Sequence, residues 1–514
     1  MKTAASSLRP AALVSRHRSS VGLRWPSKRI AALHRLPIRS VWAARCALRC
    51  APMAARSLRH LIGDTTLASW LLFLASGIAL ADCDNRFSGA VEASKQQFEP
   101  APMNYLGQQL VSKGSLNTAW SLDQGCSFGD GYKTRLKAMV NGSASSGHAG
   151  AEQASSRRWA RIYLNEAYLT VPVPGEVLID LGKKDITNGY LLFLSPMDVL
   201  RRPMGRPPYG VINEAGPSWR SSYREGSVGI DATRFLDGGS IELAAFPALG
   251  GSPGDQPVAN WSSLQRSNDS AMVYAAYSAN LWKSFNPKLV ALSTSGRHVL
   301  GAGVSDVLAE GVVFTMEYAH ASRSQVHRLS EQAADTLISG GFPSGSSVLE
   351  RTPRGSNQLA AGVRINGPQK TTLIGEFYYQ SDGYAKSDWD RYFRFTNFAL
   401  AAHRASGFQP YLDYQRLLLS AADSDGSRNL LLGRAYLTLG AEHSAQGDER
   451  IGWHASVLRN ANDRSSLLNL HLTYLVAPGS QLYLGGRWMS GGERSEFGRF
   501  GQSPLLYFGL KFSL

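Results

Sequence analysis

The sequence predicts an all-β chain that forms a transmembrane antiparallel β-barrel of about 16–18 strands. Stretches of roughly 8–12 residues carry an apolar residue at every second position, which is the period of a β-strand. Gly, Pro, Asn, Asp and Ser separate these stretches, as expected of turns. After Ala81 there is no run of apolar residues approaching the roughly 18 that a membrane helix needs, so helical spans are excluded there.

The clearest predicted hairpin lies near the C-terminus. Residues 468–476 place Leu, Tyr and Val on one face and Asn469, His471 and Thr473 on the other. A turn at 477–480 follows, and the alternation resumes over 481–488. The same pattern predicts strands in four further ranges: 312–318, 358–366, 372–380 and 431–442.

Strands with one apolar and one polar face occur in soluble sandwiches or propellers and in membrane barrels. Three features favour the membrane barrel, with its apolar face toward lipid. The polar faces carry full charges, at Glu317, Arg364, Glu376, Arg434, Glu442 and Arg487. Aromatic residues lie toward strand ends, at Tyr379, Trp453, Tyr474 and Trp488. Short turns alternate with long polar loops, notably 247–271, 321–356 and 381–393. A propeller needs a repeat of about 40–50 residues, and the sequence shows none.

Composition and charge narrow the class of protein further. With 43% hydrophobic residues, 18% charged residues and 51 Gly, the chain is neither disordered nor a coiled coil. The net charge of +15 is concentrated in residues 1–81, which hold 13 of the 54 basic residues and only one acid, Asp64. Residues 82–514 keep 41 basic and 38 acidic residues. This near balance gives no reason to expect a nucleic-acid partner.

Residues 53–81 have the parts of a secretory signal peptide. Arg56 and Arg59 precede an apolar run at 67–80, and small residues precede a cleavage point after Ala81. Residues 1–52 are free of acids and rich in Arg, which is typical of a transit peptide or of a start placed too early; we favour the early start, with Met53 as the true first residue. We therefore expect a leader over 1–81 and a barrel over 82–514.

Two cysteines, Cys83 and Cys126, remain in the expected mature chain. They are compatible with one disulfide in an oxidising compartment, or with two free thiols.

The last ten residues alternate up to the end of the sequence. Leu506, Phe508, Leu510, Phe512 and Leu514 share one face. With Tyr507, Gly509, Phe512 and Leu514, this strand resembles the C-terminal assembly signal of Gram-negative outer-membrane β-barrels, in which the final residue is usually Phe. The resemblance implies insertion by the outer-membrane assembly machinery and closure against the first strand. It also implies an outer-membrane location, in contact with lipid and lipopolysaccharide.

Two segments look like parts of long-loop porins related to alginate-export porins. They are 181–190, running on to 195–203, and 491–498. The resemblance implies a transport role and specifies no solute.

A basic cluster lies between residues 183 and 224. Its members are Lys183, Lys184, Arg201, Arg202, Arg206, Arg220 and Arg224. The Pro-rich stretch 202–210 is unsuited to a central strand and is expected to be a loop. If this loop folds inward, it constricts the pore and its arginines select anionic solutes. The alternative is a solvated surface loop whose arginines meet lipopolysaccharide phosphates or nothing specific.

We therefore expect a porin-like channel for diffusion of polar or anionic small solutes, with no cofactor and no metal site. An exopolysaccharide export channel and a non-conducting structural or adhesive barrel are alternatives. A barrel enzyme is not expected: Gly250–Gly254 matches G-x-S-x-G, but it lies in a Gly/Pro loop without the strand-to-helix elbow that exposes a nucleophilic serine.

Overall fold

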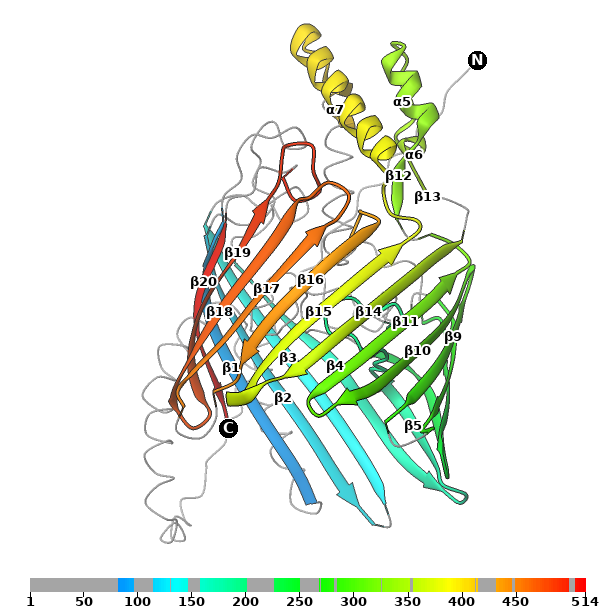
Figure 1. The fold of residues 1–514 in the computed structure, drawn as a ribbon, viewed down its shortest axis with the longest axis vertical. Helices are drawn as coiled ribbons and strands as arrows, with labels where there is room; N and C mark the ends of the chain where they lie inside the picture. Colours follow the sequence, from blue (N-terminus) through cyan, green and yellow to red (C-terminus); the bar gives the residue numbers. More distant parts are fainter. Residues whose placement is uncertain are drawn as a thin grey trace, which may run out of the picture. The chain divides into compact units, whose positions relative to one another are not determined.

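Eighteen antiparallel strands form one sheet that closes on itself, because β20 pairs with β1 as well as with β19 (Figure 1). The strands of this barrel are β1 (Asp82–Lys95), β2 (Gly114–Phe128), β3 (Tyr132–Ser146), β4 (Arg158–Val173), β5 (Val177–Lys184), β6 (Ser227–Leu236), β7 (Gly239–Phe246), β8 (Met272–Ala279), β9 (Asn286–Thr294), β10 (Arg297–Ala309), β11 (Val312–Ala321), β14 (Ser356–Asn366), β15 (Thr371–Gln380), β16 (Ala435–His443), β17 (Ile451–Asn460), β18 (Ser466–Ala477), β19 (Ser480–Ser490) and β20 (Leu505–Ser513). The predicted fold class is confirmed.

The computed structural model describes residues 82–96, 114–129, 131–146, 158–200, 226–249, 268, 270–281, 284–324, 326–351, 355–411, 413–414, 431–445, 449–498 and 504–514. Several sequence predictions fall outside these residues: the leader 1–81, the Gly250–Gly254 match, and Arg201, Arg202, Arg206, Arg220 and Arg224.

The two ends of the barrel differ in their connections. At the end where the chain enters β1 and leaves β20, which we call the turn end, all connections are short, the longest being 444–450. At the opposite end, the loop end, the chain makes long connections, including 185–226, 247–271, 322–355 and 381–434. This asymmetry is typical of outer-membrane barrels.

The two faces of the wall have opposite chemistry, as the alternation predicts. On β18, Leu468, Leu470 and Leu472 are exposed on the outer face, whereas Asn469 and His471 are buried on the inner face. Aromatic residues lie near both rims on the outer face: Trp453 and Tyr474 near the turn end, Tyr379 and Trp488 near the loop end. An apolar outer surface between two aromatic belts is the architecture of a porin-like outer-membrane β-barrel.

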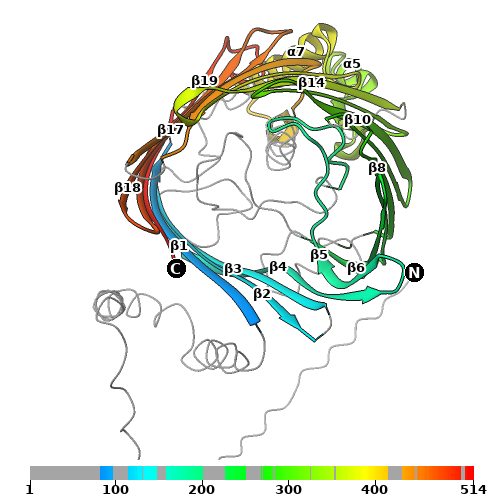
Figure 2. The ribbon, with the colours of Figure 1, turned by 60° about the horizontal axis from the view of Figure 1, so that its bottom comes forward.

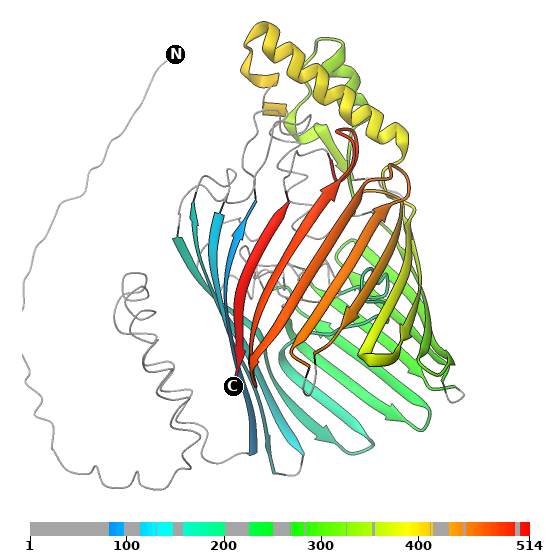
Figure 3. The same ribbon diagram turned by 60° about the vertical axis from the view of Figure 1, so that its left-hand side comes forward.

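The seam between the first and last strands runs from the pair Ser88 and Ser513 to the pair Lys95 and Leu506 (Figure 3). Gly89 makes room for Phe512, because a Cβ atom on Gly89 would come within 2.3 Å of the ring. The ring of Phe512 packs edge-on against Trp120 of β2, with centroids 5.2 Å apart. Beside the seam, Cys83 and Cys126 are directly paired on β1 and β2 and are joined by a disulfide.

Two loop-end connections fold into a small helical layer, which the sequence prediction missed. The first carries β12 (His327–Leu329), α5 (Glu331–Ile338), α6 (Gly345–Val348) and β13 (Leu349–Arg351). The second carries α7 (Lys386–Ser406). Among the described residues, no helix is both long and apolar enough to cross a membrane. The 3-10 turn η2 (Pro368–Lys370) connects β14 to β15 at the turn end.

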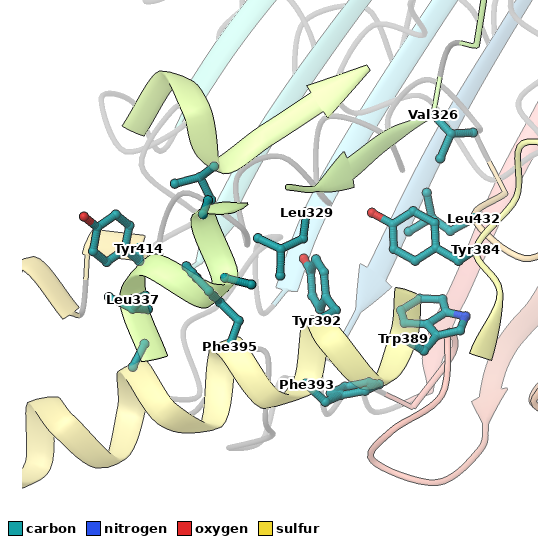
Figure 4. Close-up of a cluster of buried hydrophobic side chains, with 14 residues drawn as sticks. Val326, Leu329, Leu337, Tyr384, Trp389, Tyr392, Phe393, Phe395, Tyr414 and Leu432 are labelled. Atoms are coloured by element: carbon teal, nitrogen blue, oxygen red, sulfur yellow. The ribbon is translucent and has the colours of Figure 1, made fainter. Parts of the chain in front are cut away.

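The helical layer has its own apolar core, formed by residues from both connections (Figure 4). Trp389, Phe393 and Phe395 of α7 pack with Leu337 of α5 in this core. The Tyr414 hydroxyl donates to the Pro343 carbonyl at 2.6 Å, and burial raises the pKa of this tyrosine. The ranges 321–356 and 381–393 are long connections, as predicted, but they carry α5, α6 and part of α7 and bury an apolar core, which the prediction of polar loops missed. In α7 the buried residues recur at helical spacing within a polar sequence.

The predicted strand over 431–442 begins later than expected. β16 starts at Ala435, whereas Leu431 and Leu432 are buried among apolar side chains and Gly433 forms an isolated parallel bridge with Tyr384. Arg434 donates its Nε proton to the Gly383 carbonyl at 3.0 Å, so it belongs to the loop end.

Candidate functional site

The connection after β5 turns into the barrel. Its described part, residues 185–200, lies inside the ring of strands (Figure 2); we call it the inward segment. It has no helix or strand, so its backbone N–H groups need other acceptors. Two glutamates on the inner wall supply them.

Glu317 on β11 holds the first half of the inward segment. It is fully buried. One carboxylate oxygen accepts the N–H groups of Tyr190, at 2.5 Å, and Leu191, at 3.1 Å. The other accepts the Ser195 hydroxyl at 2.6 Å and the Met197 N–H at 3.1 Å. These four donors stabilise the buried carboxylate, with which no cationic side chain of the described residues forms an ion pair.

Glu376 on β15 holds the tip of the same segment. Glu376 is 3% exposed, and its carboxylate accepts three successive backbone N–H groups. Leu192 donates at 2.7 Å, Phe193 at 3.0 Å and Leu194 at 3.2 Å. We refer to Glu317 and Glu376 together as the carboxylate latch.

The inner wall is also shaped to receive the apolar side chains of the inward segment. A Cβ atom on Gly303 would lie 2.2 Å from the Met197 sulphur, and one on Gly362 would lie 2.6 Å from Leu191 Cδ2. A Cβ atom on Gly440 would lie 2.8 Å from the Phe193 ring. Three strands, β10, β14 and β16, therefore each carry a glycine where a side chain of the segment contacts the wall.

Packing continues beyond these glycines. Met197 and Leu200 are buried with Phe246, Tyr274 and other residues of β7–β11. Phe193 and Leu194 are buried with side chains of β14–β18. The inward segment therefore packs against two parts of the wall, β7–β11 and β14–β18, and its contacts with both are apolar.

The segment 491–498, the other porin-like stretch, forms a second anchor at the loop end. The buried carboxylate of Glu496 accepts the Leu432 N–H at 2.8 Å, the Tyr436 hydroxyl at 2.6 Å and the Asn460 amide at 2.8 Å. Phe497 packs on the same apolar cluster as Phe193. The two stretches singled out by resemblance therefore meet in one cluster of the interior.

The described part of the basic cluster lies in the wall. Lys183 and Lys184 are the last two residues of β5. Lys183 is 2% exposed, and Lys184 bridges the carboxylates of Asp180 and Asp231. The charge of Lys184 is therefore balanced within the wall. The five arginines of the cluster lie outside the described residues and follow the inward segment in the chain.

Sequence reasoning placed Glu317 and Glu376 on the polar face and missed their role. A signal was present in the strand pairing: Glu317 is directly opposite Gly303, and Glu376 is directly opposite Gly362. Where a glutamate is paired with a glycine on the neighbouring strand, the glutamate supplies a buried hydrogen-bond acceptor and the glycine leaves space for another chain segment. In the part of the chain that the structure describes, no three His, Cys, Asp or Glu side chains are grouped to hold a metal ion.

No protein-family model matches this chain, and no curated protein is similar to it in sequence. Solved structures similar to it include OccAB1 of Acinetobacter baumannii, at 10% identity and a TM-score of 0.49, covering 85% of this chain and 97% of that one. OccD3 (OpdP) of Pseudomonas aeruginosa is 9% identical with a TM-score of 0.45, covering 85% and 92%. OccK5 (OpdH) of the same organism is 7% identical with a TM-score of 0.46, covering 84% and 98%. The assignment to porin-like outer-membrane barrels rests on the closed ring of 18 strands and its apolar outer face.

Proposed function

We propose that this chain forms a channel in the outer membrane of a Gram-negative bacterium, through which polar or anionic small solutes diffuse. The observation that carries the proposal is the inward segment held by the carboxylate latch. Seven hydrogen bonds fix residues 190–197 to β11 and β15. A loop tied to the inner wall at a fixed depth narrows a barrel and sets which solutes pass.

The side chains of the inner wall favour the passage of a polar solute over that of an apolar one. Full charges and amides line it, including Arg364, Glu442 and Asn469, while the apolar residues of the same strands face outward. Enzymatic activity receives no support from this arrangement, since Glu317 and Glu376 serve to hold backbone N–H groups.

Anion selectivity is a finer part of the proposal. The arginines Arg201, Arg202 and Arg206 follow the inward segment directly in the chain, and positive charges beside a constriction favour anions. Lys184 contributes little to this field because two aspartates neutralise it. The proposed constriction therefore depends on the arginines.

The remaining parts of the proposal concern export and assembly. Residues 1–81 are proposed to be a leader that directs 82–514 across the inner membrane. Tyr507, Gly509, Phe512 and Leu514 of the closing strand β20 are proposed to address the chain to the outer-membrane assembly machinery. The partners of the folded barrel are then lipid and lipopolysaccharide.

The test is electrical. Residues 82–514 are refolded into a planar bilayer, and the single-channel conductance and the reversal potential in a salt gradient are measured. We expect stepwise conductance with a preference for anions. A barrel that folds, as judged by heat-modifiable gel mobility, but never conducts would refute the channel and favour a structural or adhesive role.

A further inference from the structure

A second group of side chains on the inner wall is unused by the latch. It lies on three neighbouring strands, β17–β19, and we call it the inner-wall cluster. His454 and His471 are directly opposed on β17 and β18, and Asn469 is directly opposed to Arg487 on β19. Opposed residues bring their Cβ atoms to about 4.5–5.5 Å.

Each member has one buried polar atom that makes no hydrogen bond among the described residues. These atoms are His454 Nδ1, Asn469 Oδ1, His471 Nε2 and Arg487 Nε. His454, Asn469 and His471 are at most 5% exposed. An unsatisfied buried polar group costs about 1–3 kcal/mol, so four in one place indicate that a polar partner binds there.

The two imidazoles are held so that their second nitrogens remain available. His454 Nε2 lies 3.1 Å from the Ser456 hydroxyl, and His471 Nδ1 lies 3.1 Å from the Tyr507 hydroxyl. The His471 ring also stacks on Tyr483, with centroids 5.5 Å apart. The protein therefore fixes both rings through one nitrogen and leaves the other nitrogen of each without a hydrogen bond to the described residues.

The cluster lies beside the point where the inward segment meets the wall. The Phe193 ring contacts Gly440, Gly440 is directly opposed to Ser456, and Ser456 is directly opposed to Asn469. A solute that passes the tip of the inward segment therefore passes these side chains. Arg487 is only half-buried, so the cluster meets the interior of the barrel at this residue.

The hydrogen-bonding capacity of the four atoms selects the ligand class. Arg487 Nε only donates and Asn469 Oδ1 only accepts, whereas the imidazole nitrogens do either. A carboxylate offers acceptors alone and leaves the asparagine oxygen unsatisfied. An ammonium group offers donors alone and leaves the guanidinium N–H unsatisfied. Hydroxyl groups satisfy both.

We propose that the inner-wall cluster is a binding site for a neutral polyhydroxylated solute, a sugar or polyol, on its path through the barrel. This inference rests on the proposed channel function and names a solute class for it. It predicts that sugars interact with the channel more strongly than simple carboxylates do.

The experiment uses protein purified from the outer membrane of an expressing strain and inserted into a planar bilayer in KCl. Sucrose is added to one side, and acetate is added in a separate run. We expect sucrose to interrupt the ion current reversibly, and acetate at equal concentration to leave it unchanged. The Asn469→Leu and His471→Phe variants each lose one hydrogen bond to sucrose, worth about 0.5–1.5 kcal/mol. The sucrose concentration for half-maximal interruption should therefore rise roughly two- to twelvefold in each.

Asn141→Leu is the matched control. Asn141 is also fully buried on the wall with its amide atoms unpaired among the described residues, but it lies on β3, away from the cluster. Its replacement should leave the response to sucrose unchanged. Interruption by acetate and not by sucrose would overturn the proposal in favour of an anion site, and no interruption by either would show that water alone fills the cluster.

The two proposals fail in different ways. If the protein conducts KCl and ignores sucrose, the channel stands and the sugar site is refuted. If the protein never conducts, the channel is refuted, and the sugar site is then judged by whether sucrose raises the unfolding temperature of the unaltered barrel more than that of Asn469→Leu, because sucrose also stabilises folded proteins in general. Should either variant fail to fold, the comparison of sucrose with acetate on the unaltered protein still decides the proposal.

Discussion

Glu376 and Gly362 are directly opposed in the β14–β15 pair, and together they receive one tip of the inward segment. The glutamate accepts the N–H groups of Leu192, Phe193 and Leu194, and the glycine leaves room for the side chain of Leu191. Glu317 and Gly303 repeat this arrangement two strands away, for Met197. The depth of the inward segment is therefore fixed by the wall at two independent points.

Replacing Glu376 by Gln should release the tip of the inward segment. Gln offers one oxygen for three N–H groups and turns an amide donor toward them. Each hydrogen bond contributes about 0.5–1.5 kcal/mol, so the tip should detach more often. We expect a larger and noisier single-channel conductance in a barrel that still shows heat-modifiable mobility.

Glu442→Gln is the control for this variant. Glu442 lies on the inner face of β16, and no hydrogen bond joins it to the described part of the inward segment. Its conductance should keep the amplitude and noise of the unaltered channel. Identical currents in E376Q and the unaltered protein would refute the latch.

Substituting Gly440 tests the fit between wall and segment. Of the described residues, a Cβ atom at this position meets only the Phe193 ring within 3.4 Å. Gly440→Ala should therefore displace Phe193 and destabilise the barrel by about 1–3 kcal/mol, the usual cost of overpacking. Combining it with Phe193→Leu should restore most of the lost free energy of unfolding, as measured by urea unfolding in detergent and a double-mutant cycle. Purely additive effects would show that the two residues are not in contact.

The proposed constriction predicts the effect of removing positive charge. Arg201, Arg202 and Arg206 replaced together by Ser should shift the reversal potential in a KCl gradient toward cation selectivity. The same three residues replaced by Lys keep the charge and should keep the anion preference. Unchanged selectivity in the Ser variant would favour the surface-loop alternative.

Glu496 should contribute more to stability than its place in a loop implies. Its replacement by Gln leaves too few acceptors for the Leu432 N–H, the Tyr436 hydroxyl and the Asn460 amide. With about 1–3 kcal/mol for each buried donor left unpaired, the temperature at which the folded band disappears on a gel should fall by several degrees. The neighbouring Glu493 is exposed, so Glu493→Gln should leave that temperature unchanged.

Much of this fold was predictable from the sequence because a barrel strand repeats one simple rule. Leu468, Leu470 and Leu472 alternate with Asn469 and His471, and that alternation alone identifies the outer and inner faces. The count of about 16–18 strands agreed with the 18 observed. The terminal strand was also placed correctly, since its alternation continues to Leu514.

The features that were missed depend on contacts distant in sequence. α7 was hidden because its buried residues follow the helical period within a loop that also carries many charges. The roles of Glu317 and Glu376 depend on a segment more than 100 residues earlier in the chain, and a polar-face glutamate looks the same in sequence whether it meets water or a latched loop. The pairing of each glutamate with a glycine is visible only once the strand register is known.

The packing at the seam predicts that substitutions in β20 differ in their effect on assembly of the barrel. Phe512 fills the space above Gly89 and packs on Trp120, so Phe512→Ala removes contacts that join the last strand to β1 and β2. Truncating a buried aromatic residue costs about 3–5 kcal/mol, and less where the ring is partly exposed, as here. We expect a clear drop in the fraction of chains recovered from the outer membrane as heat-modifiable barrels. Phe508 lies on the same outer face, is 54% exposed and has no ring contact within the described residues, so Phe508→Ala should cost little. If the two variants assemble equally well, closure does not depend on the packing of Phe512; if only Phe512→Ala fails, the aromatic packing at the seam contributes to closing the barrel.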